Sequence, residues 1–316
     1  GGGVFGAPAY YPVGDLPNGI AVADLNWDGV PDLVVSNIGS NTVSVLRGVG
    51  AGQFGTQAMY ASGTEPASVA IADFDCDGLP DIATANYVDN TASVLMQGLS
   101  GVFGLKTDYA MGTSPHGIAA TDLNLDGKPD LAVANVNDNT IDVRLGFGNG
   151  TFAQKTSYPT GGGPSAIAVG DLDCNGHPDM VTSDLDDQVS VLLNNGIATC
   201  AIFQPQVDYN GGDRSVTIDD INCDGRQDLV TANWGASTLS IFLQSSTGTF
   251  GSPQVYTTSP NPHAAIVADL NCDGRADIAT VNTLPPRNMS VFIQNSSGTF
   301  AAPVNYPTIA ACRAYI

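Results

Sequence analysis

Basic residues are scarce in this sequence. Ten lysines and arginines stand against 31 acidic residues, which gives a formal net charge of −21 over 316 residues. Without a basic patch, the chain can neither neutralise nucleic-acid phosphates nor adhere to an anionic membrane surface. No apolar run approaches the roughly 20 residues that a membrane-spanning helix needs. The sequence therefore predicts no nucleic-acid partner and no membrane insertion.

Glutamate and known catalytic motifs are also missing. Glu65 is the only glutamate, and the sequence contains no G-x-S-x-G, H-E-x-x-H or phosphate-loop motif. The aspartates are concentrated in repeated motifs, so none is obviously free for acid–base chemistry. From these absences we predict that the chain has no catalytic residues and is not an enzyme.

A nine-residue acidic motif recurs six times at constant spacing. It reads DLNWDGVPD from Asp24, and its first aspartate returns every 49 residues, at Asp73, Asp122, Asp171, Asp220 and Asp269. Such a fixed period indicates a repeat architecture, and a ring or solenoid can use a whole chain. We therefore expect a single domain over residues 1–316, although length alone would suggest about two.

Short strands dominate each repeat. In the second repeat, residues 68–72, 81–86 and 91–97 are rich in Val, Ile, Ala and Thr, and a fourth run lies around Met59–Ala61. Four strands per 40–50 residues are typical of a propeller blade, whereas a sandwich does not repeat at a constant 49. The sequence predicts an all-β fold, a β-propeller of six four-stranded blades. The alternative is seven blades, with the last one shared or incomplete.

Positions 1, 3, 5 and 9 of each motif carry oxygen-bearing side chains, and position 6 is always glycine. Calcium takes six to eight oxygen ligands, and glycine allows the loop to bend sharply around it. Position 7 would supply only a backbone carbonyl, so its side chain is free to vary. We predict about six calcium ions with these ligands: Asp24, Asn26, Asp28, Val30, Asp32, Asp73, Asp75, Asp77, Leu79, Asp81, Asp122, Asn124, Asp126, Lys128, Asp130, Asp171, Asp173, Asn175, His177, Asp179, Asp220, Asn222, Asp224, Arg226, Asp228, Asp269, Asn271, Asp273, Arg275 and Asp277.

The alternative is six metal-free acidic turns, held by hydrogen bonds from the backbone to aspartate side chains. That accounts for one aspartate per turn, but three or four converging carboxylates would repel one another without a cation. Calcium is favoured over magnesium because a cage built only from protein oxygens suits the larger ion. We expect the metal to be structural.

The combined pattern resembles the FG-GAP and VCBS repeats of extracellular β-propellers, which include the integrin α-subunit head and many secreted bacterial proteins. The resemblance is carried by DLNxDGxPDLxVxN, by TVSVLxG, and by FG elements at 4–8, 53–55 and 102–104. It covers essentially the whole chain. It implies a calcium-stabilised propeller that is secreted or on the cell surface, and the start at Gly1 without methionine is what a processed product would show.

The resemblance also frames the function. The first hypothesis is an adhesion or structural assembly module, with other copies of the chain or surface proteins and glycans as partners, that polymerises into a surface fibre. The alternatives are a calcium-dependent lectin and a non-catalytic propeller within a larger secreted enzyme. One repeat position, just before the first strand of each blade, provides these candidate ligand-binding residues: Asn18, His116, Ser165, Arg214 and His263. The competing interpretation is that they are solvated turn residues.

The six cysteines are dispersed, which does not fit a zinc site. Their even number and the expected extracellular setting favour disulfides. We predict Cys174–Cys200 first and Cys272–Cys312 next, with buried free thiols as the alternative.

The ends of the repeat do not close cleanly. Phenylalanine–tyrosine pairs typical of the fourth strand occur seven times, from Phe5/Tyr11 to Phe300/Tyr306, against six acidic motifs. One outer strand would be left over in a six-bladed ring, and an unpaired strand can pair with another chain. We hypothesise that Ala7–Val13 or Ala302–Thr308 is exchanged between subunits, giving a filament. A seven-bladed ring completed by further sequence, or an idle tail, remains open.

Overall fold

The chain is all-β. The computed structural model describes residues 5–196 and 203–308, and these residues form 26 strands and no helix. Six four-stranded sheets and one two-stranded hairpin account for all of the strands. The chain is therefore a β-propeller of six four-stranded blades, which confirms the predicted fold class. No described segment forms a helix that could span a membrane.

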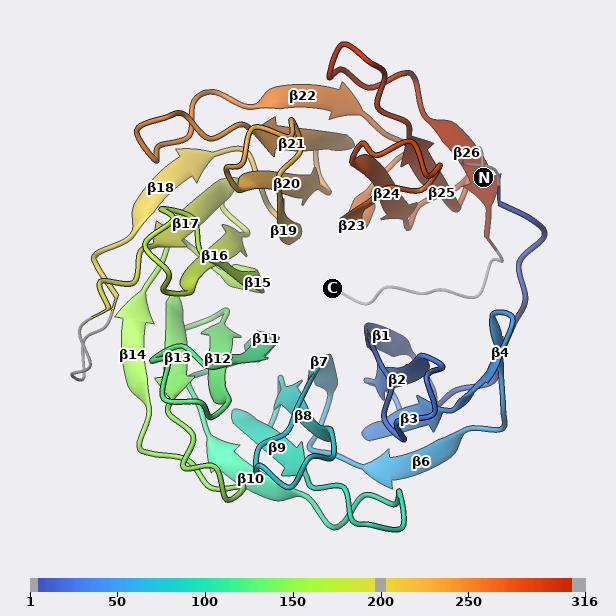
Figure 1. Ribbon diagram of the computed structural model, residues 1–316, viewed down its shortest axis with the longest axis vertical. Coiled ribbons are helices and arrows are strands. Elements are labelled where there is room, and N and C mark those ends of the chain that lie inside the picture. The colour runs from blue at the N-terminus through green and yellow to red at the C-terminus, as the bar shows by residue number, and fades with distance from the viewer. Residues whose placement is uncertain (1–4, 197–202, 309–316) are drawn as a thin grey trace. The chain divides into compact units, whose positions relative to one another are not determined.

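The chain divides into two compact units of three blades each, and Figure 1 labels their strands. The described part of the first unit is residues 10–159, with these strands: β1 Pro17–Ala23, β2 Asp32–Asn37, β3 Thr42–Leu46, β4 Gly48–Gly50, β5 Gln53–Phe54, β6 Ala58–Ala61, β7 Pro66–Ala72, β8 Asp81–Asn86, β9 Thr91–Leu95, β10 Thr107–Ala110, β11 Pro115–Thr121, β12 Asp130–Asn135, β13 Thr140–Arg144 and β14 Thr156–Pro159.

The second unit comprises residues 5–9, 160–196 and 203–308. Its strands are β15 Pro164–Gly170, β16 Asp179–Asp184, β17 Gln188–Leu192, β18 Val207–Asn210, β19 Ser215–Asp219, β20 Asp228–Asn233, β21 Thr238–Phe242, β22 Gln254–Thr257, β23 Pro262–Ala268, β24 Asp277–Asn282, β25 Asn288–Phe292 and β26 Val304–Pro307. That residues 1–316 form a single domain stays a prediction.

Consecutive strands pair antiparallel within every blade, in the order first to fourth. In five blades the first strand begins with a proline, and the register to the second strand shifts directly after it. The prediction for the second repeat was wrong about its fourth strand. Met59–Ala61 lies in β6, which pairs with β3 of the first blade, and β10 is the fourth strand of the second blade.

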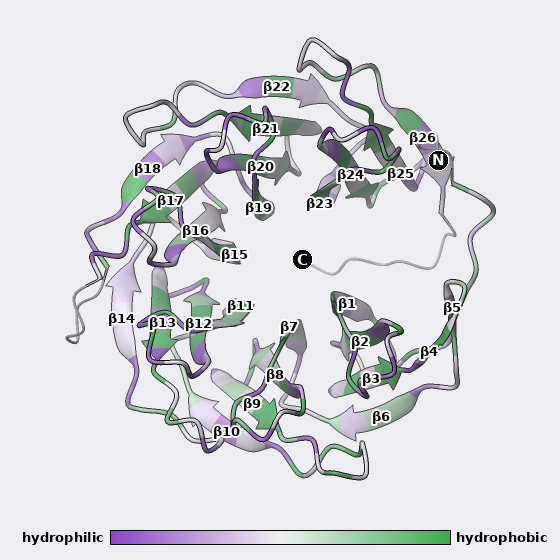
Figure 2. Cartoon of the chain, viewed as in Figure 1, coloured by the Kyte–Doolittle hydropathy of each residue, from purple (hydrophilic) through white to green (hydrophobic). Residues whose placement is uncertain are grey.

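The cores lie between adjacent blades, where buried apolar side chains of their second and third strands pack together. Figure 2 shows β9 and β13 largely in green, whereas the outer strand β14 is pale. The residue at motif position 2 enters these cores, with Leu25, Phe74, Leu123 and Leu172 at most 1 % exposed. Burying a side chain of this size stabilises the fold by about 1.5–3 kcal/mol.

The phenylalanine–tyrosine pairs join neighbouring outer segments. Tyr60 contacts Phe103 edge to face, with ring centroids 5.2 Å apart, and Tyr11 contacts Phe54 in the same way at 5.3 Å. At the other end of the chain, Phe5 packs on Tyr306 at 5.4 Å. Such aromatic pairs contribute about 0.5–1.5 kcal/mol beyond their burial.

Of the two candidate outer strands at the ends, one is used in the sixth blade. β26 pairs with β25, whereas residues 7–13 form no strand. The described structure therefore contains six blades and not the seven of the alternative.

A buried polar network recurs at the end of the second strand. Four blades carry an asparagine there whose amide donates to a serine of the third strand, as in Asn86 Nδ2 to Ser93 Oγ at 2.8 Å. The fourth blade carries Asp184 instead, fully buried. Ser190 Oγ lies 2.6 Å from Asp184 and 2.8 Å from Asp208, although a hydroxyl has only one proton to donate. Burial raises the pKa of Asp184 to about 6.

We expect Asp184→Asn to stabilise the protein above neutral pH. Because the folded-state pKa lies above the unfolded value of 3.8, the folded state holds the proton more tightly, and its stability falls as pH rises through about 6. At pH 8 the variant should gain on the order of 2–3 kcal/mol, and at pH 4 almost nothing. Urea unfolding at both pH values measures this. The matched reverse change, Asn233→Asp, should create the same pH-dependent loss in the fifth blade. Equal stability of Asp184→Asn and wild type at pH 8 would contradict the assignment.

Candidate metal centre

Each acidic motif forms the loop between the first and second strands of its blade. The glycine at position 6 has a positive φ in all six copies, between 82° and 88°. A Cβ at Gly78 would meet no atom within 4 Å, so the backbone conformation and not crowding requires glycine there. Sharp loop bending at position 6 is therefore built into every repeat.

The aspartate at position 9 is buried and fully hydrogen-bonded. It is the first residue of the second strand and is 0 % exposed in all six blades. In the second blade, Asp81 Oδ2 accepts from the Phe74 amide at 2.9 Å, and Oδ1 accepts from the Gln97 amide at 2.7 Å. The other five copies repeat both bonds at 2.6–3.1 Å. One carboxylate thereby ties the loop to the second residue after the third strand.

The other acidic positions also accept backbone amides. In the third motif, Asp122 takes the amides of Asp126 and Gly127 at 3.0 and 2.7 Å, and Asp126 takes that of Lys128 at 3.0 Å. These bonds fold the loop so that its oxygens turn inward. Each carboxylate oxygen still has a lone pair for a cation, so this network is common to the metal-free and the metal-bound interpretations.

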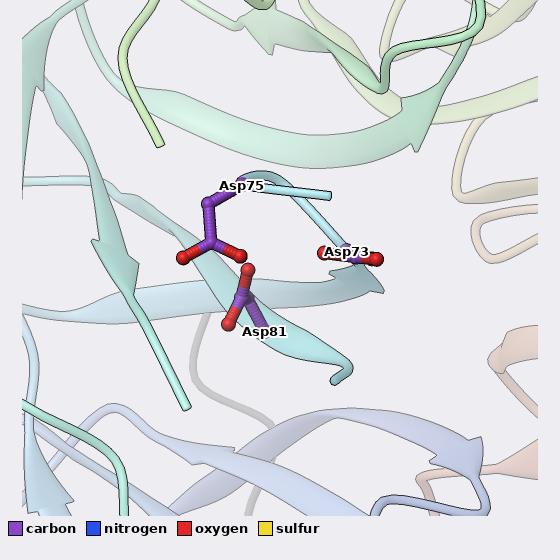
Figure 3. Close-up of side chains that lie close together, drawn as sticks. All are labelled: Asp73, Asp75 and Asp81. Carbon is purple, nitrogen blue, oxygen red and sulfur yellow. The ribbon is translucent and has the colours of Figure 1, made fainter. Parts of the chain in front are cut away.

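Two motifs bring three carboxylates together. Oxygens of Asp73, Asp75 and Asp81 lie within 4.8 Å of one another, as do those of Asp171, Asp173 and Asp179. Figure 3 shows the carboxylates of Asp75 and Asp81 facing each other. Burial raises the pKa of Asp81 to about 7, helped by the charges of Asp75 and Asp73, and burial with the charge of Asp77 also raises the pKa of Asp75. Both clusters could hold a metal ion.

The second and fourth motifs differ from the others at position 3, where they carry aspartate instead of asparagine. An asparagine offers a neutral amide oxygen that can also ligate calcium. In the sixth motif, Asn271 Oδ1 is buried without a hydrogen-bond partner, so this oxygen is available to ligate a cation. The remaining predicted ligands lie in the same loops, and their metal binding stays a prediction.

Side chains at position 7 do not enter the clusters. In the third, fifth and sixth motifs, a cation at position 7 forms an ion pair with the aspartate at position 5: Lys128 with Asp126 at 3.3 Å, Arg226 with Asp224, and Arg275 with Asp273. These cations neutralise part of the acidic charge of their own loops. Sequence reasoning treated position 7 as free to vary and missed this role.

The predicted ligand-binding position is engaged in contacts within each unit. Asn18 Nδ2 donates to the carbonyl of Ala67 at 2.7 Å, and Ser165 Oγ lies within hydrogen-bonding distance of the carbonyls of Asp213 and Arg214, at 3.2 and 3.3 Å. Both side chains link neighbouring blades. His116 contacts Tyr87 edge to face, and the Arg214 guanidinium lies over Trp234. Ligand binding by Asn18, His116, Ser165, Arg214 and His263 stays a prediction.

The cysteines at position 4 are exposed. Cys76, Cys174, Cys223 and Cys272 are free in the structure, so the buried-thiol alternative is wrong for these four. Cys200 and Cys312, the partners predicted for Cys174 and Cys272, lie outside the described residues. Both disulfides therefore stay predictions.

The fold has solved counterparts of low sequence identity. A protein from Lactobacillus plantarum superposes with a TM-score of 0.72 at 17% identity, over 96% of this chain and 88% of that one. A functionally unknown protein from Desulfotomaculum acetoxidans gives 0.64 at 12% identity, over 92% and 86%. The periplasmic gluconolactonase of Pseudomonas aeruginosa gives 0.65 at 15% identity, over 89% and 83%. None of the curated proteins matches this sequence.

The gluconolactonase corrects one prediction. Its name is that of an enzyme, and its fold is similar to that of this chain. The prediction that the chain is not an enzyme is therefore contradicted. It rested on missing motifs, and motifs of other folds do not decide what a propeller can catalyse.

The repeats themselves identify the family. The model of the FG-GAP-like repeat matches residues 24–84, 77–133, 122–182 and 220–280, and each match begins in or at an acidic motif. Together the matches cover more than half of the chain, and the six blades have the architecture that the resemblance implied. The chain belongs to the FG-GAP-like repeat family.

Proposed function

We propose that the chain is a calcium-stabilised extracellular propeller that serves as an adhesion or assembly module. The observation that carries the proposal is the pair of carboxylate clusters in the second and fourth motifs. Three carboxylates within 4.8 Å of one another, one of them buried in each cluster, repel one another, and a hard divalent cation relieves that repulsion. The net charge of −21 also favours cation uptake.

The six loops should not bind calcium equally. The second motif combines four carboxylates with Leu79 at position 7, so no cation competes for its oxygens. In the third, fifth and sixth motifs the ion pairs at position 5 compete with the metal. Calcium affinity rises with the charge of the ligand set. We therefore propose that the second motif fills first and that those three fill last.

Removing calcium should lower the melting temperature, because a ligand that binds only the folded state stabilises it by mass action. At a free calcium concentration 100 times the dissociation constant, each site adds about 2.7 kcal/mol. Calorimetric melting in EDTA and in calcium measures the effect, and elemental analysis gives the stoichiometry. An unchanged melting curve with no bound calcium would refute the proposal.

Two matched variants test the order in which calcium fills the loops. Asp75→Asn should weaken the tightest site, and Asn222→Asp should strengthen a weak one, each by about tenfold or more. Calcium titration by calorimetry compares both with wild type, and both variants keep an oxygen at position 3. Identical isotherms for the three proteins would contradict the proposed order.

Assembly is proposed from the two ends of the repeat. Residues 5–13 read FGAPAYYPV and residues 300–308 read FAAPVNYPT, which share Phe, Ala-Pro and Tyr-Pro at equal spacing. The second segment contains β26, but the first forms no strand. A strand-forming segment without a ladder can pair with the sheet edge of another molecule, so we assign residues 7–13 to a contact between copies of the chain.

Deleting residues 1–13 should abolish assemblies that the full chain forms in calcium, because the exchanged segment is then missing. Electron microscopy and light scattering measure this at high protein concentration. The double variant Tyr10→Ser, Ala9→Pro keeps Phe5 and Tyr11 in place while removing an amide that a ladder needs, and it should also fail to assemble. A full chain that stays monomeric in calcium would defeat this part of the proposal.

A further inference from the structure

Arg214 differs from the other basic side chains that the structure describes. Each of the others donates to at least one carboxylate or carbonyl, as Arg144 does to the carbonyls of Ala153 and Ala110 at 2.6 and 2.7 Å. The full set of these is Arg47, Lys106, Lys128, Arg144, Lys155, Arg226, Arg275 and Arg287. Within residues 5–196 and 203–308, only the Arg214 guanidinium has neither a hydrogen bond nor an ion pair. Its contact is the face of Trp234, 5.2 Å from the ring centroid.

The fifth blade departs from the repeat directly before this arginine. Where the other five blades start their first strand with proline, this blade has Asp213. Its carboxylate accepts the amides of Trp234 and Gly235 at 2.6 and 3.2 Å. In the second blade the equivalent amide, that of Tyr87, donates to the backbone carbonyl of Glu65. The nearest carboxylate in sequence is thus committed to the backbone and forms no ion pair with Arg214.

The backbone of Arg214 is fixed from two sides. Its amide donates to the Ala232 carbonyl at 3.1 Å, and its carbonyl is one of three that lie within 3.3 Å of the Ser165 hydroxyl. The side chain is half-buried. Burial lowers the pKa of the guanidinium, although the nearby charge of Asp213 raises it, and the group stays charged at neutral pH. Stacking occupies a face of the guanidinium but leaves its N–H donors free in the plane. The result is a half-buried guanidinium on a fixed backbone that donates no hydrogen bond to any other described residue.

We propose that Arg214 binds the carboxylate of a small monoanionic sugar acid, with Trp234 as the adjacent aromatic surface. A carboxylate matches the guanidinium fork with two parallel hydrogen bonds. A single charge suits the site because a chain of net charge −21 repels polyanions, and the flat indole suits the apolar face of a pyranose ring. The inference goes beyond the calcium binding and assembly proposed above, and the site shares no residue with the acidic loops.

The test titrates D-galacturonate into the Trp27→Phe variant, in which Trp234 is the only tryptophan. Binding should change the fluorescence of Trp234 saturably, whereas galactose, which lacks the carboxylate, should not. Acetate should bind at least tenfold more weakly than galacturonate. Calorimetry at constant ionic strength checks the same ligands without relying on the fluorophore.

Variants distinguish binding at Arg214 from a general effect of the net charge of the protein. Arg214→Gln should weaken galacturonate binding at least tenfold, and Arg214→Lys should weaken it less. Lys106→Gln removes the same unit of charge elsewhere and should bind as wild type does, and all variants should keep the wild-type calcium isotherm. The proposal is overturned if galactose or acetate binds as tightly as galacturonate, if Arg214→Gln binds normally, or if galacturonate produces no signal. A failed calcium proposal would leave these results unaffected, so the two failures are distinguishable.

Discussion

The buried aspartate at motif position 9 is the constraint on which each blade depends. It begins the second strand, and its two oxygens hold the amide of motif position 2 and the amide that follows the third strand, as Asp130 does for Leu123 and Gly146. Those bonds fix where the loop leaves the core and where the third strand ends. In the second and fourth motifs they also place this buried carboxylate within 4.8 Å of the carboxylates of positions 1 and 3. In these two motifs the residue that organises the blade also belongs to a cluster that could hold a metal ion.

Sequence reasoning captured the features that repeat. The 49-residue period and the four apolar runs predicted six four-stranded blades, because each repeat must bury its faces against a neighbour. It treated position 9 only as a metal ligand. Aspartate serves both to accept backbone amides and to bind a metal, so the residue type alone does not distinguish the two roles. The fourth strand of a blade was misplaced because Tyr60 and Phe103 lie in consecutive outer segments, and only the pairing of β6 with β3 shows to which blade a segment belongs.

The features that could not be predicted from the sequence pattern are those in which one blade departs from the repeat. Asp184 differs from asparagine only in its carboxyl group, and its raised pKa arises chiefly because the folded blade buries that group, with the charge of Asp208 adding to the effect. Arg214 was one of several polar residues at one position, and its lack of an acceptor depends on Asp213 turning toward Trp234 and Gly235. The enzyme prediction failed for a related reason: absent motifs describe other folds, and a propeller's chemistry is set by side chains that its blades bring together.

Amide hydrogen exchange tests most directly whether the buried aspartates organise the blades. In EDTA, the amides of Phe74, Leu123 and Leu172, which lie in loops, should exchange as slowly as the strand amides of their own blades, because each donates to a fully buried carboxylate. Calcium should then slow the exposed loop amides at positions 5 to 7 while changing these three little. Exchange of Phe74, Leu123 and Leu172 at the rate of open loops in the calcium-free protein would contradict the account.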